Sequence, residues 1–130
     1  MTQKVLVADD EPNILLLMEQ ALEKLQYEYD VELLVAKNGV EALEIIKQEK
    51  PNLVFLDIMM PKMSGLEVCK AVKNELGWQD VYIILLTAKG QELDKQNGMA
   101  VGANLYMTKP FRPKDVLSKS REILGLRDEG

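Results

Sequence analysis

Short apolar runs and longer amphipathic segments alternate along the whole chain. Each apolar run ends at polar or turn-forming residues, which is typical of strands that are buried on both faces of a sheet. Between the runs, apolar residues recur every three or four positions, the period of a helix with one buried side. The pattern predicts strands at residues 4–8, 31–36, 53–56, 81–86 and 105–108, and helices at about 12–26, 39–50, 66–76, 91–101 and 113–124.

Strands and helices that alternate in this way favour a single α/β fold. The strands would form a parallel sheet, and right-handed crossovers would cover both of its faces with helices. A chain of 130 residues is long enough to close one core without disulfides or metal ions. We therefore expect a three-layer α/β/α sandwich, with one domain over residues 1–130 and a core at about 4–124. Residues 125–130 would be a frayed end or the start of a linker.

Turn-forming and capping residues support the helix boundaries. Pro12 suits a first helical turn, and Gly77 and Gly125 stand where C-terminal caps are expected. The helix at 91–101 is the least apolar and contains Gly98, so it is a candidate for motion or partner contact. We expect the helices at 39–50 and 66–76 to bury the apolar residues Val40, Leu43, Ile45, Ile46, Leu66, Cys69, Val72 and Leu76.

Composition excludes several classes of function. The chain has 16 basic and 21 acidic residues, which argues against binding of nucleic acid through its phosphates. It contains no histidine, so it lacks the usual general base and any phosphohistidine of its own. The single cysteine, Cys69, is expected to be buried apolar filler. The longest apolar run, residues 81–86, is too short to span a membrane, so we expect a soluble cytoplasmic protein.

Five polar residues follow the predicted strands at one edge of the sheet, namely Asp9, Asp10, Asp57, Thr87 and Lys109. Open α/β folds place their chemistry at this edge. Carboxylates that lie close together repel one another, and a divalent cation bound by oxygen ligands relieves the repulsion, which predicts a Mg²⁺ site. A bound metal ion, the lysine and the threonine could then contact a phosphoryl group while Asp57 attacks it.

Each of these residues has a simpler interpretation when it is considered alone. Asp10 could be a helix cap, Thr87 a turn hydroxyl and Lys109 a solvated surface lysine. Met59 is more often a packing residue in a loop than part of a site. The ordered combination at successive strand ends favours the functional interpretation.

The same combination resembles the receiver domain of two-component response regulators, the CheY-like family. The resemblance covers residues 4 to about 124 and rests on Asp9-Asp10, Asp57 with Pro61 and Gly65 after it, Thr87-Ala88, Tyr106 and Lys109-Pro110-Phe111. It implies a flavodoxin-like sheet with strand order 2-1-3-4-5. It also implies a cis peptide bond between Lys109 and Pro110.

The resemblance further implies the roles of the site residues. Asp57 would accept a phosphoryl group from a histidine kinase or a histidine phosphotransfer protein. Asp10, Asp57 and the backbone carbonyl of Met59 would bind Mg²⁺ directly, and Asp9 would hold a metal-bound water. Such a domain is a signalling module rather than an enzyme with a separate substrate, and it catalyses only its own phosphorylation and slow dephosphorylation.

The resemblance implies a conformational switch as well. Thr87 would move toward the phosphoryl group and Tyr106 would turn inward, which would reshape the face formed by the helix at 91–101, the last strand and the last helix. A downstream protein or output domain would bind this face, in a monomer or a phosphorylation-linked dimer. Met59 and Lys89 would influence how readily water attacks the phosphoryl group, and we expect slow hydrolysis because Met59 cannot orient a water.

Three alternatives remain at this point. A phosphatase of the haloacid-dehalogenase type would need a second aspartate where Met59 stands. A flavodoxin-type cofactor binder would need a phosphate loop rich in hydroxyls where Asp9-Asp10-Glu11 stands. A pseudo-receiver that never carries phosphate is disfavoured by the presence of Asp10, Asp57, Thr87 and Lys109. Within the receiver interpretation, we favour a free-standing protein over a fragment of a longer regulator.

Overall fold

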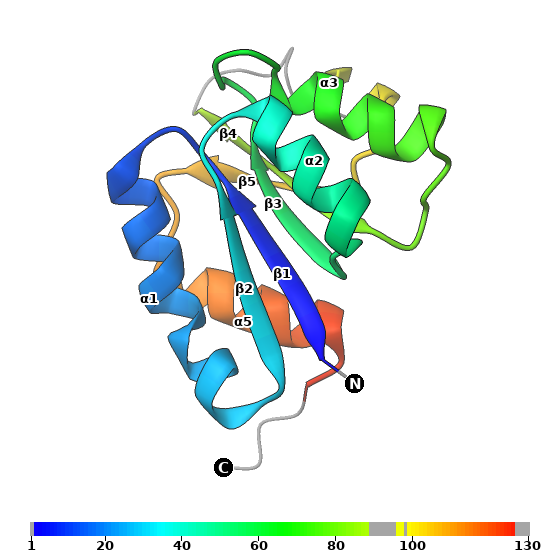
Figure 1. Ribbon diagram of the computed structural model, residues 1–130. Helices are drawn as coiled ribbons and strands as arrows, with labels where there is room; N and C mark the ends of the chain where they lie inside the picture. Colours follow the sequence, from blue (N-terminus) through cyan, green and yellow to red (C-terminus); the bar gives the residue numbers. More distant parts are fainter. Residues whose placement is uncertain (1, 89–95, 98, 127–130) are drawn as a thin grey trace.

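The computed structural model describes residues 2–88, 96–97 and 99–126, which form a parallel five-stranded sheet between two layers of helices (Figure 1). The strand order is β2-β1-β3-β4-β5, and each neighbouring pair is parallel, so the predicted sandwich and its order are confirmed. The elements are β1 (Gln3–Ala8), α1 (Pro12–Glu28), β2 (Val31–Ala36), α2 (Gly39–Glu49), β3 (Leu53–Asp57), α3 (Gly65–Lys70), the π-helical turn η1 (Ala71–Glu75), β4 (Tyr82–Ala88), β5 (Leu105–Lys109) and α5 (Pro113–Leu124).

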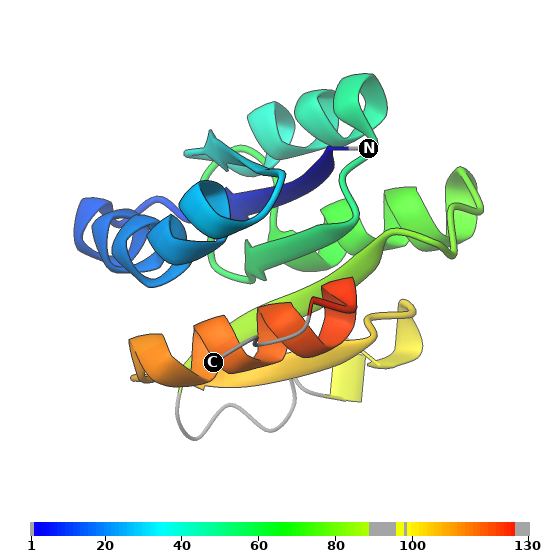
Figure 2. The same ribbon diagram turned by 90° about the horizontal axis from the view of Figure 1, so that it is seen from below.

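The sheet separates two hydrophobic clusters. Figures 1 and 2 show α1 and α5 on one face of the sheet, with α2 and α3 on the other. Strand β3 lies at the centre and all five of its residues are buried, with Phe55 pointing toward the α1 side and Leu56 toward the α2 side. The apolar run that ends at Asp57 therefore forms the middle of the core and brings one carboxylate to its edge.

Local capping interactions fix where the helices begin and end. The Asn38 side chain accepts a hydrogen bond from the Glu41 backbone N–H at the start of α2, at 2.9 Å. Ser64 and Glu67 form a reciprocal capping box at the start of α3. Gly125 ends α5 in the left-handed conformation, with φ of +70°. These contacts confirm the predicted boundaries of α2 and α5.

Several predicted details were wrong. Helix α1 continues through Tyr27 to Glu28, and β4 includes Thr87 instead of ending before it. In α2, Val40 is 41% exposed and Ala42 is buried in its place, because the buried side of the helix centres on Ala42 and Ile46. Most of the predicted helix at 91–101 lies outside the described residues.

The segment predicted as one helix over residues 66–76 is divided. It begins as α3 and continues as η1, in which the helix widens to a π-turn. Cys69 and Val72 are buried as expected, but Leu76 is 37% exposed. The widened turn buries Lys73 instead, whose ammonium donates a hydrogen bond to the Gln79 carbonyl at 3.2 Å.

Candidate functional site

The carboxyl ends of four strands bring the predicted polar residues together. Asp9 directly follows β1, Asp57 and Lys109 are the last residues of β3 and β5, and Thr87 is the last residue but one of β4. Asp57, Thr87 and Lys109 line a pocket of about 190 Å³, whereas Asp9 is buried and does not. The other lining residues are Asp10, Glu11, Ile58, Met59, Leu86 and Ala88. The prediction that these residues share one edge of the sheet is thus confirmed in position.

Three carboxylates lie at the centre of this site. One oxygen each of Asp9, Asp10 and Asp57 lies within 4.8 Å of the others. Asp9 is fully buried and Asp57 is 5% exposed, whereas Asp10 faces solvent. An all-oxygen cluster that is open on one side suits a hard cation such as Mg²⁺, which keeps part of its water shell.

The turn into α1 holds this cluster in place. Asp9 Oδ1 accepts a hydrogen bond from the Glu11 backbone N–H at 2.9 Å, and Pro12 starts the helix. The residue at the N-cap position is Glu11, and its side chain makes no capping hydrogen bond. The alternative interpretation of Asp10 as the helix cap is therefore wrong, and its carboxylate is left at the mouth of the site.

Lys109 supplies the positive charge. Its Nζ lies 2.9 Å from Asp9 Oδ2, 3.3 Å from Asp57 Oδ1 and 3.4 Å from Glu11 Oε1. The peptide bond that follows it, to Pro110, is cis, as expected. Glu11 was not predicted as a site residue, although it is the third carboxylate in the run after the first strand. Lys109 is thus an ion-pair partner of the cluster, not a solvated surface lysine.

The charges of these groups depend on one another. Burial, followed by the negative charge of Asp9, raises the pKa of Asp57 to about 6, although Lys109 opposes the shift. Burial also raises the pKa of Asp9. Burial disfavours the Lys109 ammonium, but the carboxylates of Asp9, Asp57 and Glu11 outweigh it and raise the pKa of the lysine. Lys109 therefore compensates the cluster only in part.

Thr87 and Met59 border the same pocket from different sides. Thr87 is buried, and its hydroxyl donates a hydrogen bond to the Ala88 carbonyl at 3.3 Å. Met59 follows β3 in the loop to α3 and is 67% exposed. Lys89, the other residue predicted to influence hydrolysis, lies outside the described residues. The pocket is therefore partly apolar at Met59 and has a hydroxyl at Thr87.

Tyr106 lies in β5 beside Leu85 of β4, and is half-buried against the hydrophobic cluster on the α2 side. It does not line the pocket described above. Strand β5, helix α5 and residues 96–97 and 99–101 form the described part of the face predicted to switch. Within the part of the chain that the structure describes, no helix has the length and apolar content needed to cross a membrane.

The chain is similar in sequence and in structure to several known proteins. The chain is 42% identical over 124 residues to the alkaline phosphatase synthesis transcriptional regulatory protein PhoP of Bacillus subtilis, covering 95% of this chain and 49% of that protein. It is 32% identical to the chemotaxis protein CheY4 of Vibrio cholerae, with a TM-score of 0.79 and coverage of 95% and 99%. It is 31% identical to the BeF3-activated receiver domain of DrrB, from Thermotoga maritima, with a TM-score of 0.81. That alignment covers 96% of this chain and 99% of the DrrB domain.

The chain spans about half the length of the curated relatives it matches. Residues 5–121 match the family described as the response regulator receiver domain. The match includes β1 from Val5 onward, the other four strands and the residues that line the pocket, so it covers both the fold and the site. The chain belongs to the response regulator receiver domain family.

Proposed function

We propose that this domain accepts a phosphoryl group on Asp57 and so carries a signal from a histidine kinase or a histidine phosphotransfer protein. The observation that supports the proposal most directly is the position of Asp57. It is a carboxylate at the end of a buried strand, 3.3 Å from an ammonium group and beside a pocket that opens to solvent. A donor could reach it there, and the developing negative charge would meet Lys109.

The transfer uses Asp57 as the nucleophile. One carboxylate oxygen attacks the donor's phosphorus, the bond from phosphorus to the donor nitrogen breaks, and an acyl phosphate forms while the donor imidazole keeps the electron pair. A pKa of about 6 leaves the carboxylate mostly ionised at neutral pH, so the nucleophile needs no separate base. Lys109 and the Thr87 hydroxyl are the groups of this chain proposed to bind the transferred oxygens.

Asp10, Asp57 and the Met59 carbonyl are the groups proposed to hold Mg²⁺, with Asp9 acting through a water. The donor set fits the ion, because the three carboxylates are close enough to share one cation and include solvent-facing Asp10. When bound, Mg²⁺ would neutralise charge on the phosphoryl oxygens. We infer that phosphorylation depends on it.

Phosphorylation is proposed to move Thr87 and Tyr106 and so to reshape the face that includes β5 and α5, where a downstream protein or output domain would bind. Relatives such as PhoP are transcriptional regulators about twice as long as this chain, which supports an output domain or downstream protein as the receiver of the signal. Nucleic acid would then be bound by that partner and not by this acidic domain. We further propose that the domain is cytoplasmic, has no enzymatic activity on other substrates, and is a monomer or forms a dimer linked to phosphorylation.

A mass measurement tests the central step. The chain is incubated with Mg²⁺ and acetyl phosphate, and its intact mass is compared with that of Asp57→Asn and of Asp115→Asn, a matched change at an exposed aspartate of α5. We expect wild type and Asp115→Asn to gain one phosphoryl group, and Asp57→Asn to gain none. Phosphorylation of Asp57→Asn to the wild-type level would assign the acceptor to another residue and overturn the proposal.

A further inference from the structure

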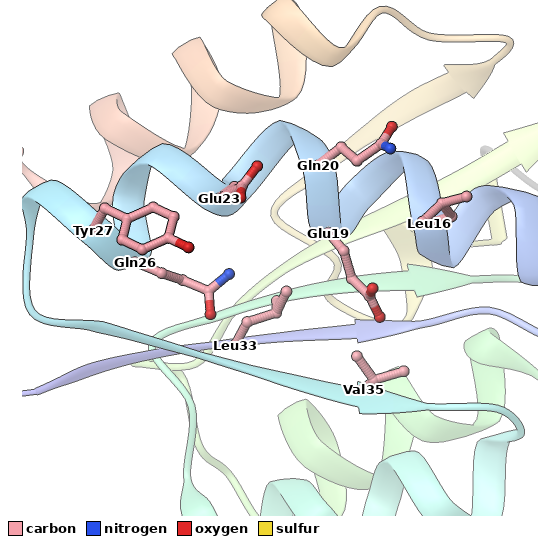
Figure 3. Close-up of a pocket in the computed structure, with 8 residues that line it drawn as sticks. All are labelled: Leu16, Glu19, Gln20, Glu23, Gln26, Tyr27, Leu33 and Val35. Carbon is pink, nitrogen blue, oxygen red and sulfur yellow. The ribbon is translucent and has the colours of Figure 1, made fainter.

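A groove runs between α1 and β2, at the border of the hydrophobic cluster on the α1 side of the sheet. Its volume is about 660 Å³, and it shares no lining residue with the pocket at the strand ends. Figure 3 shows Leu33 and Val35 pointing from β2 toward α1, with Leu16 and Tyr27 at the two ends of the bordering stretch of helix. The groove therefore has apolar side chains along its base and at both ends.

This apolar surface is open because the helical layer stops short of the edge strand. Strand β2 pairs only with β1 among the described strands, and the helices described on this face are α1 and α5. Leu33 and Val35 are only partly buried, and Leu16 and Tyr27 are 54% and 82% exposed. Exposed large apolar residues gathered in one groove mark a site of interaction more often than isolated ones do.

The polar residues of the groove give it a negative charge. Glu19 and Glu23 of α1 line it together with the amides of Gln20 and Gln26, and Glu19 extends toward β2 in Figure 3. None of the described residues that line it is basic. The single lysine of α1, Lys24, is paired with Glu28 at 3.9 Å. A cationic partner is thus complementary to this surface.

We propose that the groove binds a cationic amphipathic helix of a partner protein. Its apolar side would cover Leu33 and Val35, and its lysines or arginines would lie beside Glu19 and Glu23. Residues 16–27 of α1 extend over about 16 Å, roughly three helical turns, which a helix with anchors four and seven positions apart would match. Such a helix would lie beside α1 and extend the α1–α5 layer over the edge strand.

The charges disfavour other occupants. A second copy that docked symmetrically on the same groove would bring the carboxylates of Glu19 and Glu23 against their own counterparts. An added β-strand would pair with the backbone edge of β2 in the plane of the sheet, and would leave the carboxylates on α1 without contact. A helix that contacts both α1 and β2 satisfies the apolar and the acidic residues together.

A titration followed by NMR tests the proposal. The full isotope-labelled chain, with Mg²⁺ present throughout, is titrated with a peptide of leucine and lysine about 18 residues long, which forms a helix with one apolar side. We expect the largest amide shifts at residues 16–27 and 33–35, and a gain of helical circular dichroism in the peptide. A peptide of the same composition with two central prolines should leave these amides unshifted, since it cannot form the helix.

Charge-reversal variants show whether the groove itself is responsible. Glu19→Lys/Glu23→Lys should weaken peptide binding about tenfold or more, a loss expected for close charge pairs. Glu44→Lys/Glu75→Lys makes the same change in net charge at exposed positions of α2 and η1, and should weaken it less than about twofold. Both variants should accept a phosphoryl group from acetyl phosphate as fast as wild type.

Several results would overturn the proposal. Equal weakening by the two double variants would show a general attraction between an acidic protein and a basic peptide. Shifts confined to the amides around Asp9, Asp57 and Lys109 would place the peptide at the phosphoryl pocket. Groove shifts that appear with rising protein concentration, in the absence of peptide, would identify a second copy as the occupant. A peptide that gains strand structure would show pairing with β2.

Discussion

The ionised form of Asp57 serves the proposed chemistry but destabilises the fold. Its folded-state pKa of about 6 lies above the ordinary value of 3.8, chiefly through burial. The folded chain therefore holds a proton on Asp57 at pH values where the unfolded chain has released it, and stability rises as pH falls through the window from about 6 to 4. At neutral pH without divalent cations, the ionised Asp57 costs up to about 3 kcal/mol.

We accordingly expect Asp57→Asn to be more stable than wild type by about 1–3 kcal/mol at pH 7.5 in a chelator. The advantage should fall to about one third of this value at pH 4.5, because wild-type Asp57 is then protonated in the fold but still mostly ionised in the unfolded chain. Urea unfolding followed by the fluorescence of Trp78, the single tryptophan, measures both values. Asp115→Asn is the control for the loss of one exposed carboxylate. A difference for Asp57→Asn that is constant with pH would contradict the assignment of the shift.

Met59 carries the kinetic prediction. Its side chain borders the pocket beside Asp57, is 67% exposed and has no hydrogen-bond donor with which to orient an attacking water. Met59→Asn should therefore shorten the lifetime of the phosphorylated chain several-fold, measured by intact mass after the phosphodonor is removed. Met99→Asn is the matched control, because Met99 is 58% exposed and does not line the pocket. Decay of Met59→Asn at the wild-type rate would exclude this role.

At the scale of elements, the loop from β3 to α3 determines where Asp57 lies. A Cβ added at Gly65 would lie 2.2 Å from the Asp57 carbonyl oxygen, and the Gly65 N–H donates to the Ile58 carbonyl at 2.9 Å. Only a residue without a side chain allows the first turn of α3 to approach the end of β3 this closely. The glycine is needed for space, since its φ is not positive.

Gly65→Ala should thus displace the loop and destabilise the fold by about 2–3 kcal/mol, in the range of overpacking substitutions. It should also slow phosphorylation by acetyl phosphate, because the added methyl group would displace the backbone of Asp57, the proposed acceptor. Gly77→Asn is the control, because no atom lies within 4 Å of a Cβ there and asparagine tolerates the φ of +70°. Gly77→Asn should cost under about 1 kcal/mol. Equal losses in both variants would argue against the steric explanation.

The sequence pattern predicted helices and strands well where a single local signal, such as burial or capping, determined their position. Strand β3, which is apolar up to Asp57, and the capped helix α5 were placed correctly because burial and capping are local signals. Leu76 was misplaced because the π-turn η1 changes the angular position of each following residue, and a constant helical period does not include it. Val40 was wrongly predicted to be buried because it is apolar, whereas α2 turns the smaller Ala42 toward the sheet and leaves Val40 exposed.

At the scale of the whole molecule, topology explains why the site was predictable. Parallel strands end at one edge, so Asp57 and Lys109, which are far apart in the sequence, meet once the order of strands is known. The contact of Glu11 with Lys109 could not be predicted in this way, because it depends on the reach of a side chain at an exposed helix start. Strand ends locate the site, and side-chain conformations decide which charges it contains.

The balance of charge at that edge makes a prediction for the whole fold. One ammonium compensates the three clustered carboxylates and Glu11 only in part, so Mg²⁺ should bind the folded chain better than the unfolded chain and stabilise it. At one hundred times its dissociation constant the ion would add about 2.7 kcal/mol, which corresponds to a rise in melting temperature of about 10 °C for a domain of this size. Thermal unfolding in increasing MgCl₂ at constant ionic strength measures the effect.

The charge variants separate site binding from general screening. Asp10→Asn removes the solvent-facing carboxylate of the cluster and should abolish most of the rise in melting temperature. Asp80→Asn removes an exposed aspartate that pairs with Lys50, outside the cluster, and should keep the full rise. If both variants respond to Mg²⁺ as wild type does, the ion acts on the surface as a whole, and the carboxylates at the strand ends do not form a metal site.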